Sequence, residues 1–363
     1  MTATRIPFLS LRPGEDASAV DEAIRRVVDR GWFVLGPEVE AFERAFADAS
    51  GAAYSVGVGT GTDALVLILK ALGIGRGDEV ITTPVSAAYT ALAVMAVGAR
   101  PVFADIDPER LTIDPAAVET LVGPATAAII PVHLYGQPAD MVALSAIAER
   151  HGLAMIEDCC QAHLATCGGR PVGSFSVAAA YSFYPTKNLG ALGDGGAITT
   201  DDASLAARLS RLRNGGQTDR YHHGEPGVNS RLDEIQAAIL SARLEFLPKW
   251  TDQRRALAAV YRRELAGAGV VVPPEFDAGH VYHLFPVLTR DRDALRTRLG
   301  DAGIETLIHY PVPIPRQPAL ASELPAACPI ADRVCAEILS LPMYPSMPEA
   351  HAVEVARAIH VAA

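Results

Sequence analysis

The chain has 363 residues, of which 50% are apolar and 20% are charged, and this length and composition predict two globular domains with a large buried core. Lysines and arginines number 31 against 42 aspartates and glutamates, which gives a net charge of −11. Because no dense basic cluster accompanies this acidic balance, nucleic acid and anionic membrane surfaces are poor partners.

The amino terminus lacks the apolar core of a signal peptide, and no uncharged apolar run reaches the length of a membrane span, so a cytoplasmic location is expected. An odd number of cysteines without paired C-x-x-C spacing predicts reduced thiols and no zinc or other metal site. The cysteines are Cys159, Cys160, Cys167, Cys328 and Cys335.

The first part of the chain combines helices with one strand and one glycine-rich turn. Apolar spacing predicts helices over residues 16–30, 38–49 and 66–72 and a strand over 54–58. Gly59-Thr60-Gly61-Thr62 lies between that strand and the third helix. Such a turn offers unpaired N–H groups and the positive end of a helix dipole to a phosphate, although helix capping by Thr60 or Thr62 explains it equally well.

The same turn admits a rival cofactor. Gly59-x-Gly61-x-x-Ala64 between a strand and a helix matches the dinucleotide fingerprint. That fingerprint requires an acidic residue at the end of the next strand, about 20 residues further along the chain. Asp78 and Glu79 precede that strand instead of ending it, so an NAD-dependent oxidoreductase is the less favoured hypothesis.

From residue 80 onward, strands and helices alternate regularly, which implies a parallel sheet with right-handed crossovers. The expected strands are 80–83, 101–105, 127–132, 153–158 and 196–200, and the expected helices are 87–97, 115–122, 141–151 and 203–213. A polar, glycine-bearing loop over 215–229 and a helix over 230–246 follow. The charged residues Arg231, Asp233 and Glu234 suggest that this helix has a solvated face.

We place a domain boundary near residue 246, which gives a large domain over 1–245 and a smaller C-terminal α+β domain over 246–363. The expected elements of the small domain are helices over 251–265, 291–302, 330–339 and 348–362 and strands over 270–272 and 282–288.

Two short stretches combine residue types that carry chemistry. The apolar run 153–156 ends abruptly at Glu157 and Asp158, as a buried strand does at the carboxyl edge of a parallel sheet, where ligands bind. Lys187 follows the apolar run 177–184 and stands among glycines, with no other charge until Asp194. A lysine amine is a nucleophile only when desolvation or a second cation lowers its pKa.

A strand-end carboxylate and an isolated lysine are the pair that pyridoxal phosphate (PLP) requires. The lysine supplies an amine for the Schiff base, and the carboxylate supplies an anion for the pyridine nitrogen. Lys187 by itself would more often be a solvated lysine in a glycine-rich loop, and Asp158 is what favours the cofactor hypothesis.

With these segments in order, the chain resembles the DegT-type sugar aminotransferases, PLP enzymes of the aspartate aminotransferase fold (fold type I), over nearly its whole length. The segments that carry the resemblance are 61–65, 157–158 with 161–163, 182–183 with 187–188, 193–196 and 229–231. The resemblance implies an α/β fold, with a mainly parallel sheet in the large domain and a smaller C-terminal α+β domain.

The resemblance also implies a role for each matching residue. Lys187 would bind PLP covalently and later move the substrate proton, Asp158 would hold the pyridine nitrogen, and Gln161 would lie beside the phenolic oxygen. The phosphate would be bound by Gly61, Thr62 and Ser182, and by Asn229 of the partner subunit, which makes the protein a homodimer with shared active sites. His163, His309 and Tyr310 are weaker candidates for contact with the substrate.

The sequence departs from the family pattern at three places. Ala87 stands at the position where the family commonly has an aromatic residue that stacks on the PLP ring. Only Tyr89, two residues on, is left for that role. Cys159 and Cys160 replace the usual small pair after the aspartate. Prolines at 313 and 315 stand where a second histidine is common, so the substrate geometry of the family does not transfer.

The leading hypothesis is a ping-pong transamination in amino sugar or antibiotic biosynthesis, from an amino acid donor, expected to be glutamate, to a keto sugar carried on a nucleotide diphosphate. The same chemistry on a keto cyclitol and a PLP-binding protein without turnover remain alternatives. Four arginines are candidates for a diphosphate, although solvated helix faces are the commoner explanation for such residues. They are Arg213, Arg220, Arg231 and Arg316.

Overall fold

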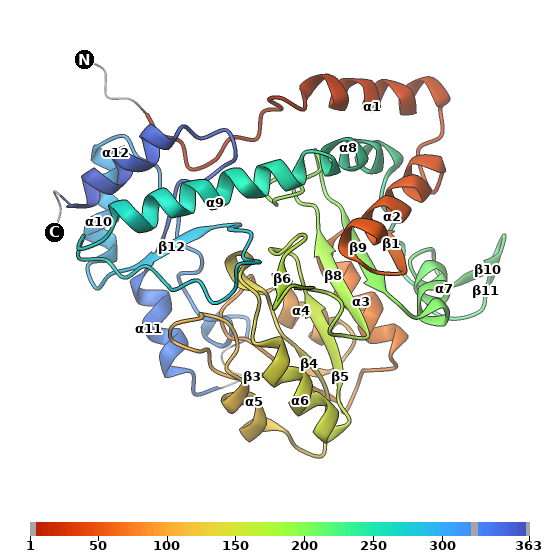
Figure 1. The fold of residues 1–363 in the computed structure, drawn as a ribbon. Helices are drawn as coiled ribbons and strands as arrows, with labels where there is room; N and C mark the ends of the chain where they lie inside the picture. Colours follow the sequence, from red (N-terminus) through yellow and green to blue (C-terminus); the bar gives the residue numbers. More distant parts are fainter. Residues whose placement is uncertain (1–4, 321–325, 361–363) are drawn as a thin grey trace.

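The computed structural model describes residues 5–320 and 326–360, which surround a seven-stranded sheet with the order β1-β9-β8-β5-β4-β2-β3 (Figure 1). Neighbouring strands are parallel except β9, which runs antiparallel to both β1 and β8. The strands are β1 (Tyr54–Val58), β2 (Glu79–Thr82), β3 (Arg100–Phe103), β4 (Thr126–Ile130), β5 (Ala154–Asp158), β8 (Ala178–Ser182) and β9 (Gly196–Thr200). The predicted α/β fold with a mainly parallel sheet is confirmed.

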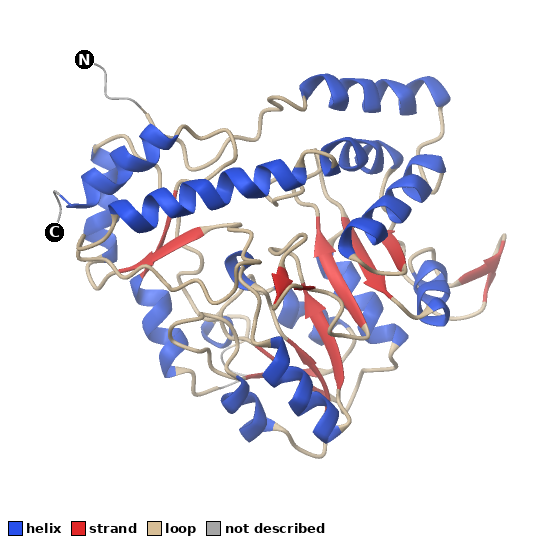
Figure 2. Ribbon diagram, viewed as in Figure 1, coloured by secondary structure: helices blue, strands red, loops and turns tan. Residues whose placement is uncertain are grey.

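Helices cover both faces of this sheet (Figure 2). One face packs against α3 (Gly61–Ala71), α4 (Tyr89–Ala96) and α7 (Ala203–Leu212). The other face packs against α2 (Pro37–Ser50), α5 (Pro115–Leu121), α6 (Met141–His151) and α8 (Glu234–Leu244). Alternate residues of β8 serve the two faces, since Ala178 and Ala180 belong to the α3 side whereas Ala179 and Tyr181 belong to the α2 side.

The C-terminal part of the chain builds a separate apolar cluster, to which the chain start contributes Ile6. The elements of this part of the chain are α9 (Leu247–Glu264), β12 (Phe285–Leu288), α10 (Arg292–Asp301), α11 (Pro329–Glu337), β13 (Ile338–Leu341) and α12 (Glu349–His360). The prediction of a helix over 330–339 was wrong at the carboxyl end, because Ile338 and Leu339 pair with β12 as a strand. The strand predicted over 270–272 is a single bridge from Val271 to Leu288, and the domain boundary stays a prediction.

The remaining elements are short pieces and one amino-terminal helix. They are α1 (Ala17–Arg30), the 3₁₀ turns η1 (Leu134–Gly136) and η2 (Ile314–Arg316), and the strand pairs β6 (Thr166–Cys167) with β7 (Arg170–Pro171) and β10 (Gln217–Asp219) with β11 (His222–His223). The last pair forms a hairpin that projects from the body of the molecule, so the segment predicted as a loop over 215–229 contains regular structure (Figure 1). Tyr221, at its tip, is 77% exposed.

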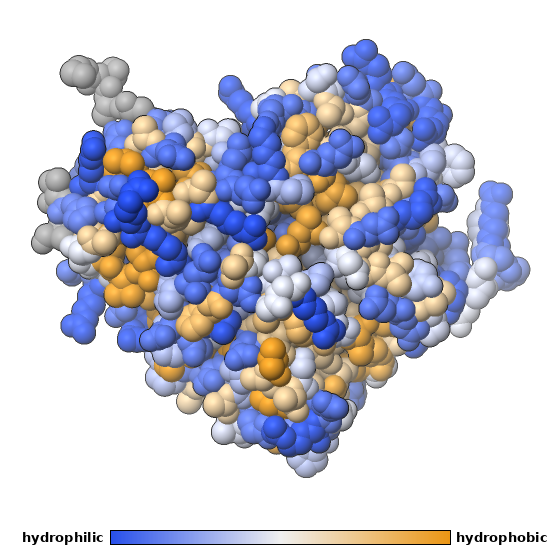
Figure 3. Space-filling model, in the orientation of Figure 1, coloured by the Kyte–Doolittle hydropathy of each residue, from blue (hydrophilic) through white to orange (hydrophobic). Residues whose placement is uncertain are grey.

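The face shown in Figure 3 is largely hydrophilic, with apolar residues gathered between α9 and α2. Among residues 5–320 and 326–360, no helix combines the length and the apolar character that crossing a membrane would require.

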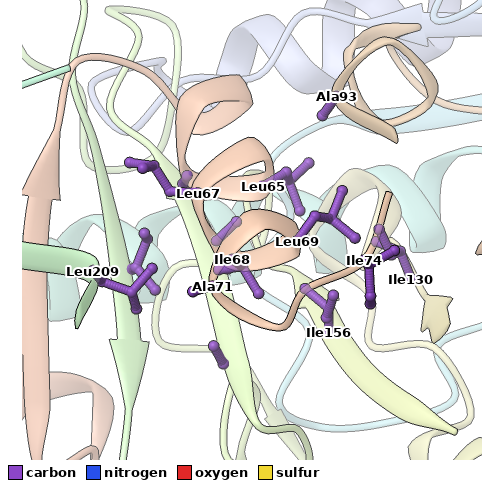
Figure 4. Packing of buried hydrophobic residues seen from close by; sticks show 14 of the residues in the cluster. Leu65, Leu67, Ile68, Leu69, Ala71, Ile74, Ala93, Ile130, Ile156 and Leu209 are labelled. Atoms are coloured by element: carbon purple, nitrogen blue, oxygen red, sulfur yellow. The ribbon is translucent and has the colours of Figure 1, made fainter. Parts of the chain in front are cut away.

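Helix α3 forms the centre of the largest core cluster (Figure 4). Leu65, Leu67, Ile68 and Leu69 are almost fully buried, as expected for a helix that is apolar all round. The helix begins at Gly61, five residues before the predicted start at 66, because Thr60 caps it: its Oγ1 accepts a hydrogen bond from the Asp63 N–H at 3.0 Å.

Glu234 at the start of α8 is completely buried, so the solvated face predicted for this helix was wrong at that residue. Its carboxylate accepts hydrogen bonds from the N–H groups of Gly36, Glu38 and Val39 at 2.8 to 3.0 Å. These donors belong to the free first turn of α2, where a negative charge also meets the positive end of the helix dipole. Glu234 therefore fixes Gly36 and the start of α2 against α8.

We expect Glu234→Ala to lower the free energy of unfolding by roughly 2–4 kcal/mol, because three buried N–H groups lose a charged acceptor. Urea denaturation at one protein concentration, followed by circular dichroism, measures this loss. Glu245→Ala, at the exposed end of the same helix, is the matched control and should change stability by less than about 0.5 kcal/mol. Equal effects of the two substitutions would contradict the anchoring role.

Candidate active site

The sequence-predicted residues meet at the carboxyl edge of the sheet. Asp158 ends β5 and Ser182 ends β8, its direct neighbour in the sheet. Gly61 begins α3 after β1, which is parallel to β8 because both run antiparallel to β9. Lys187 follows β8 in the loop that leaves this edge. In open α/β sheets this is the edge at which ligands bind.

Asp158 is 4% exposed, and its two carboxylate oxygens have separate donors. Thr90 Oγ1 donates to one at 2.7 Å, and the Cys160 N–H donates to the other at 3.1 Å. Sequence reasoning missed Thr90, since its position in the first turn of α4 gives no sign that it faces a residue 68 positions away. The carboxylate is thereby held in one orientation at the end of β5.

Lys187 is half-buried, and its N–H donates to the Tyr184 carbonyl at 2.8 Å. Burial lowers the pKa of the Lys187 ammonium, while the nearby Asp158 charge opposes that shift. The structure therefore brings the predicted lysine and carboxylate into one electrostatic site and supplies the desolvation that a reactive lysine needs.

A close approach without a side chain places the start of α3 at this site. A Cβ on Gly61 would come within 2.7 Å of Cys160 Sγ and 2.8 Å of Ser182 Cβ, so only glycine fits. The first-turn N–H groups of Gly61 and Thr62 have no intrahelical partner, whereas that of Asp63 is capped by Thr60. These two free donors lie beside Ser182, as a phosphate site requires.

Gln161 is 3% exposed and links two other parts of the chain. Its Oε1 accepts from the Tyr135 N–H at 2.7 Å, and its Nε2 donates to the Tyr310 hydroxyl at 3.0 Å. The Tyr135 hydroxyl in turn donates to the His309 carbonyl at 2.6 Å. The structure thus joins Gln161 to the predicted His309-Tyr310 element, and burial raises the pKa of Tyr310 to about 12.

Three imidazoles surround Lys187 and are kept neutral. Burial, reinforced by the Lys187 charge, lowers the pKa of His163 to about 3 and of His309 to about 4. The same two causes lower the pKa of His283. His163 Nε2 lies 2.9 Å from the Ser182 carbonyl, and its Nδ1 is buried without a partner in the described chain. His283 was not singled out from the sequence, although a histidine inside an apolar strand pattern is a usable signal.

Two predicted residues stay outside this cluster in a single chain. Tyr89 is 62% exposed, and Asn229 is exposed beside its bridge partner Asn214. The stacking role of Tyr89 therefore remains a prediction, and so does the phosphate role of Asn229, which concerns a second chain.

Of the four arginines considered for a diphosphate, Arg213 and Arg316 pair with carboxylates of this chain. Arg231 donates to an amide oxygen of Asn214 at 3.1 Å, and Arg220 stands on the projecting hairpin.

A buried hydrogen-bond network supports the end of β5. His133 Nε2 lies 3.0 Å from Glu157 Oε1, and His133 Nδ1 accepts from the Ala139 N–H, so Nε2 carries the proton. Glu157 also accepts from two backbone N–H groups and from Ser176 Oγ. Burial, with Glu157 adding to it, raises the pKa of the neighbouring Cys159 thiol. The potential metal ligands of His133, Glu157 and Cys159 are therefore already occupied by hydrogen bonds or protonated.

The donor set at the sheet edge fits PLP. Lys187 matches the aldehyde, Asp158 the pyridine nitrogen and the free N–H groups of α3 the phosphate. Cys160, close to Lys187, is kept as a thiol because burial and then the Asp158 charge raise its pKa. It is thus a poor competitor for an aldehyde.

Comparisons with known proteins agree with this site. The DegT/DnrJ/EryC1/StrS aminotransferase family model matches residues 15–360. The dTDP-3-amino-3,4,6-trideoxy-alpha-D-glucose transaminase of Streptomyces venezuelae is 48% identical over 361 residues, which cover 98% of this chain and 95% of that protein. The UDP-N-acetyl-3-dehydro-alpha-D-glucosamine 3-aminotransferase of Acidithiobacillus ferrooxidans is 44% identical over 98% of this chain and 97% of that protein.

Solved structures point the same way. The crystal structure of S. venezuelae DesV in complex with a ketimine intermediate superimposes with a TM-score of 0.96 at 47% identity, covering 98% of both chains. These likenesses leave the NAD-dependent alternative without support. The chain belongs to the DegT/DnrJ/EryC1/StrS aminotransferase family and is a PLP-dependent aminotransferase.

Proposed function

We propose that this enzyme transfers an amino group from an amino acid, with glutamate the expected donor, to the 3-keto group of a nucleotide-linked deoxy sugar. The pairing of a desolvated Lys187 with the buried Asp158 carries the proposal for the chemistry. The sugar and its position 3 rest on the two relatives reported above, since one is named for a 3-amino sugar nucleotide and the other for amino transfer to a 3-dehydro sugar nucleotide. A pathway for amino sugars or antibiotics in the cytoplasm would follow.

When bound, PLP supplies an electron-withdrawing ring that stabilises negative charge at the reacting carbon of the substrate. Asp158, held by Thr90 and the Cys160 N–H, would hold the ring nitrogen and favour its protonated form. Lys187 acts as the general base and acid, because burial lowers the pKa of its amine and so makes the proton easier to give up and take back. Gln161, which is fixed by its own hydrogen bonds, would lie beside the phenolic oxygen of the cofactor.

The phosphate is proposed to lie at the start of α3. The N–H groups of Gly61 and Thr62 and the Ser182 hydroxyl supply donors there, and the helix dipole favours the negative charge. His163, which lies against the Ser182 carbonyl, and the His309-Tyr310 element, which is bonded to Gln161, are proposed to contact the substrate.

The working unit is proposed to be a homodimer with shared sites. Several large apolar side chains are exposed in the single chain. Four aromatic residues each expose more than half of their surface: Trp32, Tyr89, Tyr184 and Tyr221. Exposed aromatic groups of this kind mark protein interfaces. Asn229, exposed beside the base of the hairpin, would reach the phosphate of the partner subunit, and Tyr89 would become covered.

Lys187→Ala is expected to abolish the covalent chromophore and to reduce amine incorporation by at least about 1,000-fold, because the variant loses both the Schiff base and the proton carrier. Borohydride reduction and peptide mapping of the wild type should place the cofactor on Lys187, with Lys70 and Lys249 as the other lysines of the chain. Product mass, with a panel of keto sugars and keto cyclitols plus glutamate, identifies the acceptor. Turnover by Lys187→Ala would refute the proposal.

Thr90→Val is expected to reduce kcat about 10-fold while leaving the sugar KM within about 2-fold, because the variant loses a hydrogen bond to the Asp158 carboxylate and no substrate contact. In Asp158→Asn, kcat should fall by at least about 100-fold, since a neutral amide no longer balances the protonated ring nitrogen. Thr90→Ser, which keeps the hydroxyl, is the control. A Thr90→Val enzyme equal to wild type would show that this hydrogen bond is irrelevant.

Shared sites can be tested by mixing two inactive variants. Asn229→Asp should repel the phosphate of the partner's site, and Lys187→Ala inactivates its own site. Random association gives half mixed dimers, each with one intact site out of two, so about a quarter of wild-type activity should return. Mixing without any recovery would mean that Asn229 does not act across the dimer.

A further inference from the structure

A cavity of about 320 Å³ opens beside Lys187. Five separate segments form its walls: residues 9–16, the loop 185–190, Arg243 of α8, the first half of α9 and residues 344–346. Trp250, Gln253 and Arg254 contribute from α9, and their i, i+3, i+4 spacing puts them on one helix face. The cavity is thus a built space between distant parts of the chain, with the reactive lysine in its wall.

Several charges at this cavity are already balanced within the chain. Arg243 donates to Asp16 at 2.8 Å and to the Gly190 carbonyl at 2.5 Å. Glu15 pairs with Lys249 and accepts from the Trp250 indole N–H at 3.0 Å. These groups need no further ligand.

Arg254 is different, because it is 6% exposed and has no carboxylate partner among residues 5–320 and 326–360. Its Nη1 donates to three backbone carbonyls at 3.2 to 3.3 Å, which are long hydrogen bonds. Within the described part of the chain, its Nε has no partner, and Gln253 Oε1 on the same helix face has none either. Burial lowers the pKa of Arg254 to about 10, so the guanidinium is still charged at neutral pH.

Among the described residues, the charged groups of the cavity wall that lack a counter-charge are Arg254 and the exposed Arg12, and both are positive. A buried cation without a counter-charge is unfavourable, and an anion entering the cavity would remove that penalty. The planar guanidinium fork suits a carboxylate. A volume near 320 Å³ lies at the low end of the roughly 300–1,000 Å³ of small-molecule sites, which suits an amino acid better than a whole sugar nucleotide.

We propose that Arg254 holds a carboxylate of the amino acid donor in this cavity, with Arg12 at the mouth, while the donor's amine faces Lys187. This assignment deepens the proposed function and rests on it, since it names where the donor is recognised. Phosphate groups share the same chemistry, so the test includes them as a separate arm.

The test is equilibrium binding to the PLP-loaded enzyme by titration calorimetry. Glutarate serves as the probe for the donor because it has both carboxylates but no amine to react, and thymidine diphosphate and inorganic phosphate probe the other source. Arg254→Gln should weaken glutarate binding at least about 10-fold and leave thymidine diphosphate within about 2-fold. Arg255→Gln is the matched control, because Arg255 is the next residue of the helix, is absent from the cavity wall and donates to the His280 carbonyl at 3.1 Å.

Arg254 also ties α9 to the carbonyls of residues 282, 283 and 343, so its loss could unfold the protein. Ser346→Glu avoids this problem, because it adds a carboxylate at an exposed position of the cavity wall and leaves Arg254 in place. The added charge should weaken glutarate binding at least about 10-fold. The glutamate KM should rise in both variants while the sugar KM stays unchanged.

Unchanged glutarate binding in folded Arg254→Gln or Ser346→Glu would overturn the assignment. Weakened diphosphate or phosphate binding with unchanged glutarate binding would also overturn it, in favour of a phosphate site. Failure of the proposed function has a different signature, because a wild-type enzyme that aminates no keto sugar can still bind glutarate through Arg254.

Discussion

The buried carboxylate of Asp158 is the constraint on which the rest of the site depends. A charge at the end of a central strand, 4% exposed, is tolerated only if hydrogen-bond donors and a counter-charge replace water. Thr90 and the Cys160 N–H supply the donors, and Lys187 supplies the opposite charge. The desolvation that makes the Asp158 charge costly also lowers the pKa of Lys187. One environment therefore prepares both halves of the cofactor site.

Supporting contacts reduce the freedom of this pair. Glu157, the neighbour of Asp158 on β5, is fully buried and bonded to His133, to two backbone N–H groups and to Ser176. On the other side, Gly61 lets α3 start in contact with Ser182 and Cys160. Because the strand end and the helix start are both fixed, a cofactor held between them would be positioned without side-chain rearrangement.

The surrounding imidazoles complete an unusual charge balance. Burial keeps His163, His283 and His309 unprotonated at neutral pH, so they add hydrogen-bonding groups around Lys187 without adding positive charge. Arg254, which has no carboxylate partner among the described residues, lines the same cavity as Lys187. An enzyme that must bind an anionic donor and also move a proton benefits from this division, since the fixed charge attracts the donor and the neutral groups leave the lysine free to titrate.

Local patterns in the sequence determined the elements and the identity of the reactive pair. The helix over 141–151 and the strands over 54–58 and 196–200 agree with the structure to the residue, because apolar spacing and flanking glycines act within a few positions. Lys187 and Asp158 were recognisable because each interrupts an apolar stretch with a charge. Only the tertiary structure decided that Thr90 bonds to Asp158, that Glu234 is buried against α2 and that Arg254 lacks a counter-charge. These contacts join residues tens to hundreds of positions apart, and their energies depend on burial, which chain folding creates and no local pattern records.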